Sequence, residues 1–256
     1  MNEQNKKTNE PGSIVAIGSG KGGVGKTWMA ISVSQALAHM GRKVLLFDGD
    51  LGLANVDVQL GLMPRKDLFT VLEKGMPLTA VKFAYEPGGF DIIAGRSGSS
   101  SLASLSPMRH TALIDEIRGL ATDYDDIIID LGAGVERTVR HFASLADKLL
   151  VVTNDEPTSL TDAYAFIKLM ARAGACNTIC LAINSATTDK DGKRTFNTLC
   201  KACEGFLNFS PPLAGIVRND KRVTDAIRNQ TPLLTRWPTS TAASDIERIA
   251  EHLVTR

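Results

Sequence analysis

The sequence predicts an α/β fold in which a mostly parallel central sheet is covered by helices on both faces. Four short, almost entirely apolar runs occupy residues 14–17, 44–47, 126–130 and 149–152. Runs of this kind are typical of parallel strands that are buried on both faces, whereas half-exposed strands alternate. Segments with helical periodicity lie between the runs, and 256 residues suffice for one such domain with a proper core.

The composition indicates no strongly charged partner, since 29 basic and 28 acidic residues leave a net charge of +1. A nearly neutral chain has no global field that favours nucleic acid or an anionic membrane. The sequence contains no apolar run of 18 residues, and the polar segment 1–12 lacks the apolar centre of a signal peptide. We therefore expect a cytoplasmic protein in which 1–12 form a flexible tail and 13–256 form a single domain.

The most informative stretch follows the first apolar run, where glycines and lysines precede an amphipathic segment. It consists of Gly20, Lys21, Gly22, Gly23, Val24, Gly25, Lys26 and Thr27. The pattern G-x-x-x-x-G-K-[ST] between a strand and a helix predicts a phosphate-binding loop, in which backbone N–H groups and the helix dipole face an anion. Lys26 supplies a positive charge for the β- and γ-phosphates, and the Thr27 hydroxyl is a suitable ligand for Mg²⁺.

Carboxylates follow two other predicted strands. Asp48 and Asp50 come after the run 44–47, and Asp130 ends the run 126–130. The carboxyl ends of parallel strands form the edge of the sheet at which open α/β folds bind ligands. Because carboxylates repel a nucleotide unless they act on a metal ion or on water, their position predicts a Mg²⁺ site with Asp130 as a ligand.

The remaining elements alternate in the same way, and the serine-rich stretch 97–106 marks no domain boundary. We expect a helix after the loop that ends near Gly41, and another that begins at Pro107 with Ser106 as its N-cap. Residues 155–164 predict a helix start with Thr158 or Ser159 as N-cap, and we assign no chemistry to them. Further strands are expected at 90–94, 178–184 and 213–217, and further helices at 221–228 and 244–254.

Four cysteines raise the question of a metal or cluster site. Cys200 and Cys203 form a C-x-x-C pattern, but the residues between them are not turn formers and the segment has helical character. Cys180 lies within an apolar strand, where a thiol behaves as a small hydrophobe. We expect reduced structural cysteines, and a cluster site remains the alternative.

Several stretches resemble one protein superfamily. The loop K-G-G-x-G-K-T carries an extra lysine, Lys21, and so resembles the deviant Walker A loop of the MinD/ParA superfamily of P-loop ATPases. Residues 48–57, 105–110 and 155–164 are similar to the version carried by the flagellar-number regulators, the FlhG/FleN family. The resemblance covers 14–254 and implies the MinD-like P-loop NTPase fold.

This resemblance implies a slow ATPase with ATP and Mg²⁺ as cofactors, which forms a homodimer when ATP is bound between its subunits. The implied catalytic residues are Asp50, which orients the attacking water, and Lys26 and the partner-reaching Lys21, which neutralise phosphoryl charge. The implied metal ligands are Thr27, Asp48 and Asp130. The implied nucleotide contacts are the loop 20–27, Trp28, Asn184, Arg218 and Asp220.

The sequence departs from the family at three positions. Trp28 stands where relatives carry a small polar residue that contacts the α-phosphate, so only its backbone N–H remains for that contact. Leu131 replaces a Ser or Thr after the Walker B aspartate, and Arg218 replaces a proline beside the base. The N-terminal residues also lack a D-Q-A motif, which some relatives use to activate a partner GTPase.

The implied function is control of flagellar number or placement. The implied partners are a flagellar GTPase of the signal-recognition type, a flagellar transcription regulator or a basal-body switch protein, with recruitment to a cell pole through that partner. The alternatives are a positioning ATPase for division or chromosomes, and an iron–sulfur carrier. The nitrogenase iron protein is excluded because 130–135 contain no cysteine.

Neither DNA nor lipid is an expected partner. Between 214 and 240 five basic residues oppose two acidic ones, which is a modest excess for a DNA-binding surface. The last predicted helix carries three acidic and two basic residues between 245 and 256, and its apolar stripe contains no Trp or Phe. We expect that stripe, formed by Ile246, Ile249 and Leu253, to pack on the domain.

Overall fold

The computed structural model describes residues 11–95 and 107–255. Several sequence predictions lie outside these residues: most of the flexible tail, the serine-rich stretch and the N-cap Ser106. Within the described part, Gly12 is already attached to the domain, because its N–H donates a hydrogen bond of 2.7 Å to the carbonyl of Ala121.

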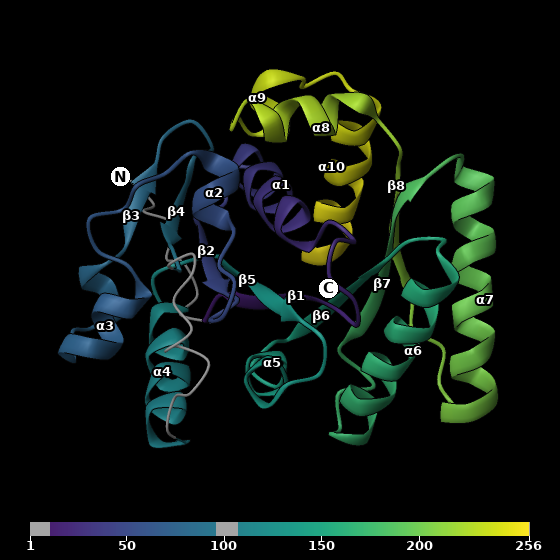
Figure 1. Cartoon of the computed structure of the whole chain (residues 1–256), viewed down its shortest axis with the longest axis horizontal. Coiled ribbons are helices and arrows are strands. Elements are labelled where there is room, and N and C mark those ends of the chain that lie inside the picture. Colours follow the sequence, from purple (N-terminus) through teal and green to yellow (C-terminus); the bar gives the residue numbers. More distant parts are fainter. Residues whose placement is uncertain (1–10, 96–106, 256) are drawn as a thin grey trace, which may run out of the picture.

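The described residues form one eight-stranded sheet with the order β3-β4-β2-β5-β1-β6-β7-β8 (Figure 1). Every pairing is parallel except that of β3 with β4 at one edge, which confirms the mostly parallel sheet. The strands are β1 (Ser13–Ser19), β2 (Val44–Gly49), β3 (Phe83–Tyr85), β4 (Phe90–Ile93), β5 (Asp126–Ala133), β6 (Lys148–Thr153), β7 (Ile179–Ala186) and β8 (Leu213–Arg218). Each predicted strand is therefore present, and only the short β3 was missed.

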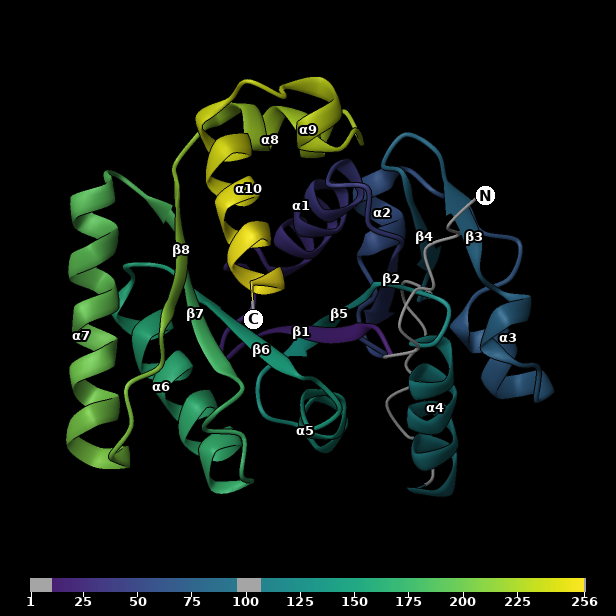
Figure 2. The same ribbon diagram turned by 180° about the vertical axis from the view of Figure 1, so that it is seen from behind.

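Helices cover both faces of the sheet, as Figures 1 and 2 show from opposite sides. One face packs against α3 (Leu68–Lys74), α4 (Pro107–Leu120), α5 (Arg137–Ala143), α6 (Pro157–Arg172) and α7 (Asp189–Leu207). The other packs against α1 (Lys26–His39), α2 (Val56–Leu60), α8 (Lys221–Arg228), α9 (Leu233–Arg236) and α10 (Thr241–Val254). A short 3₁₀ helix, Leu78–Ala80, follows α3.

The continuous apolar runs are explained by this layering. Ile127 and Ile129 of β5 belong to the core on one face, whereas Ile128 belongs to the core on the other. The same alternation holds in β2, where Phe47 and Leu46 point to opposite cores. Because successive side chains leave opposite faces of a strand, a central strand needs apolar residues at every position.

Two helix starts differ from the sequence prediction. Helix α6 begins at Pro157 with Glu156 as N-cap, so the prediction of Thr158 or Ser159 as N-cap was wrong. Proline is well suited to the first helical position, where its missing N–H would have no partner in the helix. Helix α10 begins at Thr241, three residues before the predicted start, because the Ser240 side chain caps it by accepting from Ala243 N–H.

The C-terminal helix packs as expected from its apolar stripe. Ile246, Ile249 and Leu253 are all buried in the core between α10 and the sheet. A side chain at Gly215 of β8 would lie 2.5 Å from Ile249, so helix and strand are in close contact. No helix among the described residues has the length and apolar character needed to cross a bilayer.

This packing predicts a large cost for truncating Ile249. Ile249→Ala should lower the free energy of unfolding by about 2–4 kcal/mol, because a fully buried side chain leaves a cavity. Urea denaturation followed by circular dichroism measures the change. The exposed Glu251→Ala on the same helix serves as the control and should shift stability little, whereas equal effects would contradict the assigned helix orientation.

Candidate functional site

The loop that follows β1 and the carboxylates at the ends of β2 and β5 meet at one edge of the sheet. Strands β1 and β2 flank β5, and the pairing places both Ile17 and Asp48 opposite Asp130. The three predicted groups are therefore neighbours, although up to about a hundred residues separate them in the chain. This is the carboxyl edge at which parallel α/β sheets bind ligands.

The phosphate-binding loop depends on glycine at points of close approach. Gly25 has φ 94°, which L side chains rarely adopt, and a Cβ there would lie 2.3 Å from the Asn184 side-chain nitrogen. A Cβ at Gly20 would lie 2.0 Å from the carbonyl oxygen of Asp162 in α6. The loop is thus pressed between α6 and the end of β7, and only residues without a side chain fit.

Lys26 occupies the first position of α1 and is 8% exposed. Burial lowers the pKa of its ammonium group, and the nearby carboxylates of Asp130 and Asp50 act in the opposite direction. A buried cation of this kind is stable only beside negative charge, which the two aspartates supply in the free protein. Lys26 is therefore placed where an anionic ligand would meet it.

Asp130 is the most unusual group of the site. It is almost completely buried, and neither of its carboxylate oxygens has a hydrogen-bond partner in the described structure. Burial raises the pKa of Asp130 to about 7, while the neighbouring Thr27 hydroxyl and Lys26 ammonium act to lower it. Buried polar oxygens are rarely left unpaired, so this carboxylate fits the ligand of a divalent cation.

Asp48 is held by backbone groups, and its assignment as a metal ligand stays a prediction. Its two oxygens accept hydrogen bonds of 3.2 Å from the backbone N–H groups of Asp50 and Val56, so it shapes the turn after β2. Burial raises its pKa well above the usual range, and the charge of Asp130 adds to this effect. No group of three or more His, Cys, Asp or Glu side chains among the described residues could hold a metal ion. A Mg²⁺ ion here would take Thr27 and Asp130 as ligands and complete its shell with water and phosphate oxygens.

Asp50 contacts both the loop that follows β2 and the end of β5. Its Oδ1 atom accepts the N–H groups of Gly52 and Leu53, at 3.3 and 2.9 Å. A Cβ at Gly132 would lie 3.3–3.6 Å from the same carboxylate, so the end of β5 passes directly against it. The position predicted to orient water is thus in contact with both segments.

Lys21 does not share the surroundings of Lys26. Its ammonium donates to Glu156 Oε2 at 2.7 Å and to the Thr158 hydroxyl at 2.8 Å, both at the start of α6. The sequence of 155–164 predicts a capped helix start with no chemistry, so this contact of Lys21 was not predicted. The signal that could have indicated it was the similarity of that stretch to the flagellar family.

The side chains assigned to the base are held by other protein groups. Asn184 donates to the Val24 carbonyl at 2.8 Å, and Asp220 caps α8 by accepting from Arg222 N–H. Arg218 forms a bidentate pair with the buried Asp245, at 3.0 and 2.7 Å. Trp28 is buried, and its indole nitrogen has no partner among the described residues. The structure therefore brings the phosphate-binding loop and the carboxylates together, whereas Asn184, Asp220 and Arg218 contact other protein groups.

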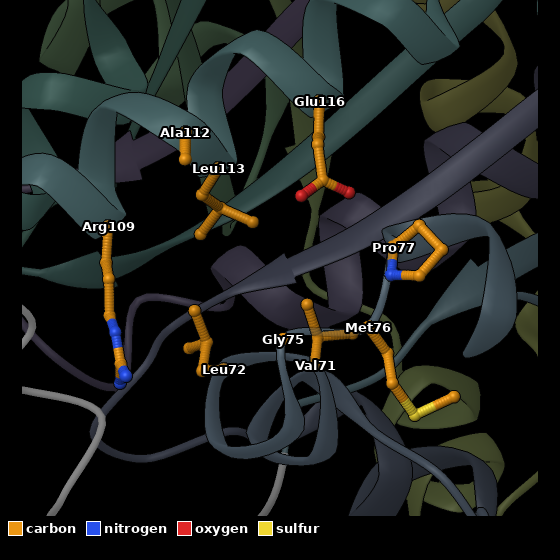
Figure 3. A pocket seen from close by; sticks show the side chains of 9 residues that line it. All are labelled: Val71, Leu72, Gly75, Met76, Pro77, Arg109, Ala112, Leu113 and Glu116. Atoms are coloured by element: carbon orange, nitrogen blue, oxygen red, sulfur yellow. The ribbon is translucent and has the colours of Figure 1, made fainter.

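A separate hollow lies between α3 and α4, with a volume of about 340 Å³ (Figure 3). It is lined by Val71, Leu72, Gly75, Met76, Pro77, Arg109, Ala112, Leu113 and Glu116. The Glu116 carboxylate at its rim accepts the backbone N–H of Leu78 at 2.7 Å. None of these residues belongs to the predicted site.

The four cysteines are free thiols, and Cys180, Cys200 and Cys203 are buried. Burial raises the pKa of Cys180 to about 12 and that of Cys203 to about 11, so neither thiol ionises readily. Cys200 and Cys203 lie within α7, as the sequence predicted.

Comparison with known proteins identifies the family. A family model described as the CobQ/CobB/MinD/ParA nucleotide binding domain matches residues 15–233. The chain belongs to this family. It is therefore a nucleotide-binding P-loop ATPase, in agreement with the loop and the carboxylates at the sheet edge.

Three similar proteins indicate the branch of the family. The antiactivator FleN of Pseudomonas aeruginosa is 37% identical over 94% of this chain and 86% of its own length. The flagellum site-determining protein YlxH of Helicobacter pylori is 30% identical over 95% of this chain and 82% of its own. The structure of the septum site-determining protein MinD of Pyrococcus horikoshii, complexed with Mg-ADP, matches with a TM-score of 0.79 and 25% identity, covering 95% and 96% of the two chains. The fold and the resemblance predicted from the sequence are confirmed.

The raised pKa of Asp130 predicts the pH dependence of stability. A carboxyl group whose pKa is raised by folding favours the native state while it is protonated, and that contribution falls as pH rises from about 4 towards about 7. Asp130 alone should therefore make the nucleotide-free protein about 1 kcal/mol less stable at pH 8 than at pH 6, and the raised pKa of Asp48 adds a further loss in the same direction. Urea denaturation at both pH values measures this difference.

Asp130→Asn should reduce that pH dependence by about 1 kcal/mol, because it eliminates one of the two buried carboxyl groups and leaves Asp48. The exposed Asp123→Asn is the matched control and should keep the wild-type slope. An Asp130→Asn protein that retains the full slope would show that Asp130 does not titrate in this range.

Proposed function

We propose that this protein is an ATP-dependent dimerising switch whose ATPase activity regulates the number or placement of flagella. The observation that carries the proposal is the convergence of Lys26, Asp50 and the unpartnered Asp130 beside the phosphate-binding loop. The names of two relatives, an antiactivator FleN and a flagellum site-determining protein, support the flagellar role.

The residues of the site have distinct roles in hydrolysis. Backbone N–H groups of the loop 20–27 hold the phosphates, and Lys26 neutralises charge that develops on the transferred phosphoryl group. Thr27 and Asp130 would hold Mg²⁺, which supplies charge neutralisation for the β- and γ-phosphates. Asp50 orients the attacking water, and Lys21 reaches the nucleotide of a second copy of the chain.

The two segments that contact Asp50, the loop after β2 and the end of β5, are suited to a switch. Because this carboxylate accepts N–H groups from 52–53 and lies against Gly132, a movement of Asp50 at the γ-phosphate would displace both segments. Order that depends on the γ-phosphate and is lost on hydrolysis is a common device in P-loop proteins. ATP would thus favour the dimer, and hydrolysis would return the chain to the monomer.

The protein would act in the cytoplasm and reach a cell pole through a partner. Its partners would be a flagellar GTPase of the signal-recognition type, a flagellar transcription regulator or a basal-body switch protein. A positioning ATPase for the division site is the second candidate, because the solved structure of a septum site-determining MinD has the same fold. DNA is disfavoured, since Arg218, one of the five basic residues between 214 and 240, is paired with Asp245.

A deletion strain distinguishes the two candidates. Loss of the protein should change the number or position of flagella while septa stay in place. Normal flagella with misplaced septa would instead favour division control.

Asp50→Ala should separate binding from hydrolysis. The variant should bind ATP and dimerise but lose turnover about 100-fold or more, because orienting water stabilises the transition state rather than the bound nucleotide. Phosphate release and light scattering measure the two properties. Lys26→Ala is the contrasting variant and should weaken ATP binding itself, whereas normal turnover in Asp50→Ala would remove Asp50 from this role.

The packing of α10 predicts weak direct binding to lipid. Its apolar stripe is buried, and residues 245–256 carry no basic excess to attract an anionic surface. Co-sedimentation with anionic vesicles at physiological salt should therefore recover little protein with or without ATP, as for uncharged control vesicles. Strong pelleting that requires both ATP and anionic lipid would overturn this expectation.

A further inference from the structure

The hollow between α3 and α4 lies apart from the phosphate-binding loop and has the form of a small ligand site (Figure 3). Its volume of 340 Å³ falls within the range of about 300–1,000 Å³ that is usual for pockets that bind small molecules. Val71 and Leu113 in its lining are buried, and Leu72 is half-buried. Most of the lining is therefore apolar, as in sites that accept an apolar ligand body.

The hollow follows from where α3 ends. Gly75 terminates this helix with φ 64°, and the Met76 N–H returns to the Val71 carbonyl at 3.2 Å. A Cβ on Gly75 would have nothing within 4 Å beyond its chain neighbours, so the space beside the helix end is open. The facing wall is one side of α4, because 109, 112, 113 and 116 recur at helical spacing over two turns, or about 10 Å.

The two charged side chains of this wall are separated. Figure 3 shows Arg109 and Glu116 apart on α4, with Ala112 and Leu113 between them. The Glu116 carboxylate is held at its position, because its Oε2 accepts the Leu78 N–H at 2.7 Å. A guanidinium attracts an anionic group and a carboxylate repels one. An amphipathic anion would therefore lie in one direction, with its charge at Arg109 and its apolar body over Leu113.

Arg109 also belongs to a stretch that has no role in the proposed hydrolysis. Residues 105–110 are similar to the flagellar-number regulators, and none of them is assigned to the phosphate site. The Arg109 side chain is exposed, so the packing of α4 on the sheet does not require an arginine at this position. A charged contact with a ligand in the hollow would give this residue a function.

We propose that the hollow between α3 and α4 binds a small amphipathic anion, an aryl or acyl compound with a single carboxylate or sulfonate group. The apolar body displaces water from Val71, Leu72 and Leu113, and the Arg109 guanidinium binds the anionic group. The site shares no residue with the phosphate-binding loop, so the proposal does not depend on ATP hydrolysis or dimerisation.

The first measurement tests the anionic contact with two matched probes. Anilinonaphthalene sulfonate, which fluoresces in apolar surroundings, should bind the full chain saturably, with the same affinity with and without Mg-ADP. Arg109→Gln should weaken its binding about three- to ten-fold. The uncharged analogue N-phenylnaphthylamine has the same rings without the sulfonate, so it should bind the wild type and Arg109→Gln equally. Arg118→Gln removes an exposed arginine from α4 outside the hollow and should leave both affinities unchanged.

The second measurement tests the place of binding. Ala112 is exposed and lines the hollow, so the ring in Ala112→Phe should occupy the space and weaken both probes about ten-fold or more. A urea midpoint close to that of the wild type shows that the variant is folded. Sulfonate binding that a folded Ala112→Phe leaves unchanged overturns the hollow as the site, as does the absence of saturable binding in the wild type. Equal loss of both probes in Arg109→Gln overturns the anionic contact. ATP binding and dimerisation are measured separately, so failure of the proposed function leaves these results unaffected.

Discussion

The site depends on the burial of two carboxylates that face each other on adjacent strands. Asp48 and Asp130 are opposite in the β2–β5 pairing, and both are almost fully buried. Removing two like charges from water is costly, and the nearby Lys26 offsets only part of that cost. Asp48 is satisfied by backbone N–H groups, whereas Asp130 is left with unpaired oxygens. A cation bound with phosphate would supply what the protein alone does not.

Several glycines are needed near this site because the polypeptide backbone passes close to the carboxylates. Backbone must approach within contact distance of the carboxylates, so Gly95 lies against Asp48 and Gly132 lies against Asp50. In the phosphate-binding loop, Gly25 likewise leaves room for the Asn184 side chain. Each of these contacts joins segments distant in sequence, and a larger residue would force the segments to shift. The close packing therefore extends from the phosphate-binding loop to the end of β5 beside Asp50.

The structure explains two of the three departures from the family pattern, Leu131 and Arg218. Leu131 is buried beside Phe166, so an apolar side chain packs in the core at the position where the family commonly has Ser or Thr. Arg218 is paired with Asp245, which also accepts from Arg248, so the segment at the end of β8 is fixed by charge rather than by a proline ring. Trp28 is buried with its indole N–H unpaired, and nothing in the structure explains that N–H.

Much of the fold was determined by the sequence alone. Uninterrupted apolar runs specified the central strands, because only strands buried on both faces need apolar residues at every position. The loop 20–27 and the aspartates at strand ends were equally readable, since their chemistry is local. Short elements such as α5 and β3 were missed, because a few residues carry too weak a periodic signal. The tertiary structure alone decided the partners of the polar side chains: that Asp48 binds backbone, that Arg218 pairs with Asp245, and that Lys21 rests on Glu156. Arg218 and Asp245 are 27 residues apart in the chain, and Lys21 and Glu156 are 135 residues apart. No local sequence pattern encodes which distant group the folded chain will bring within reach.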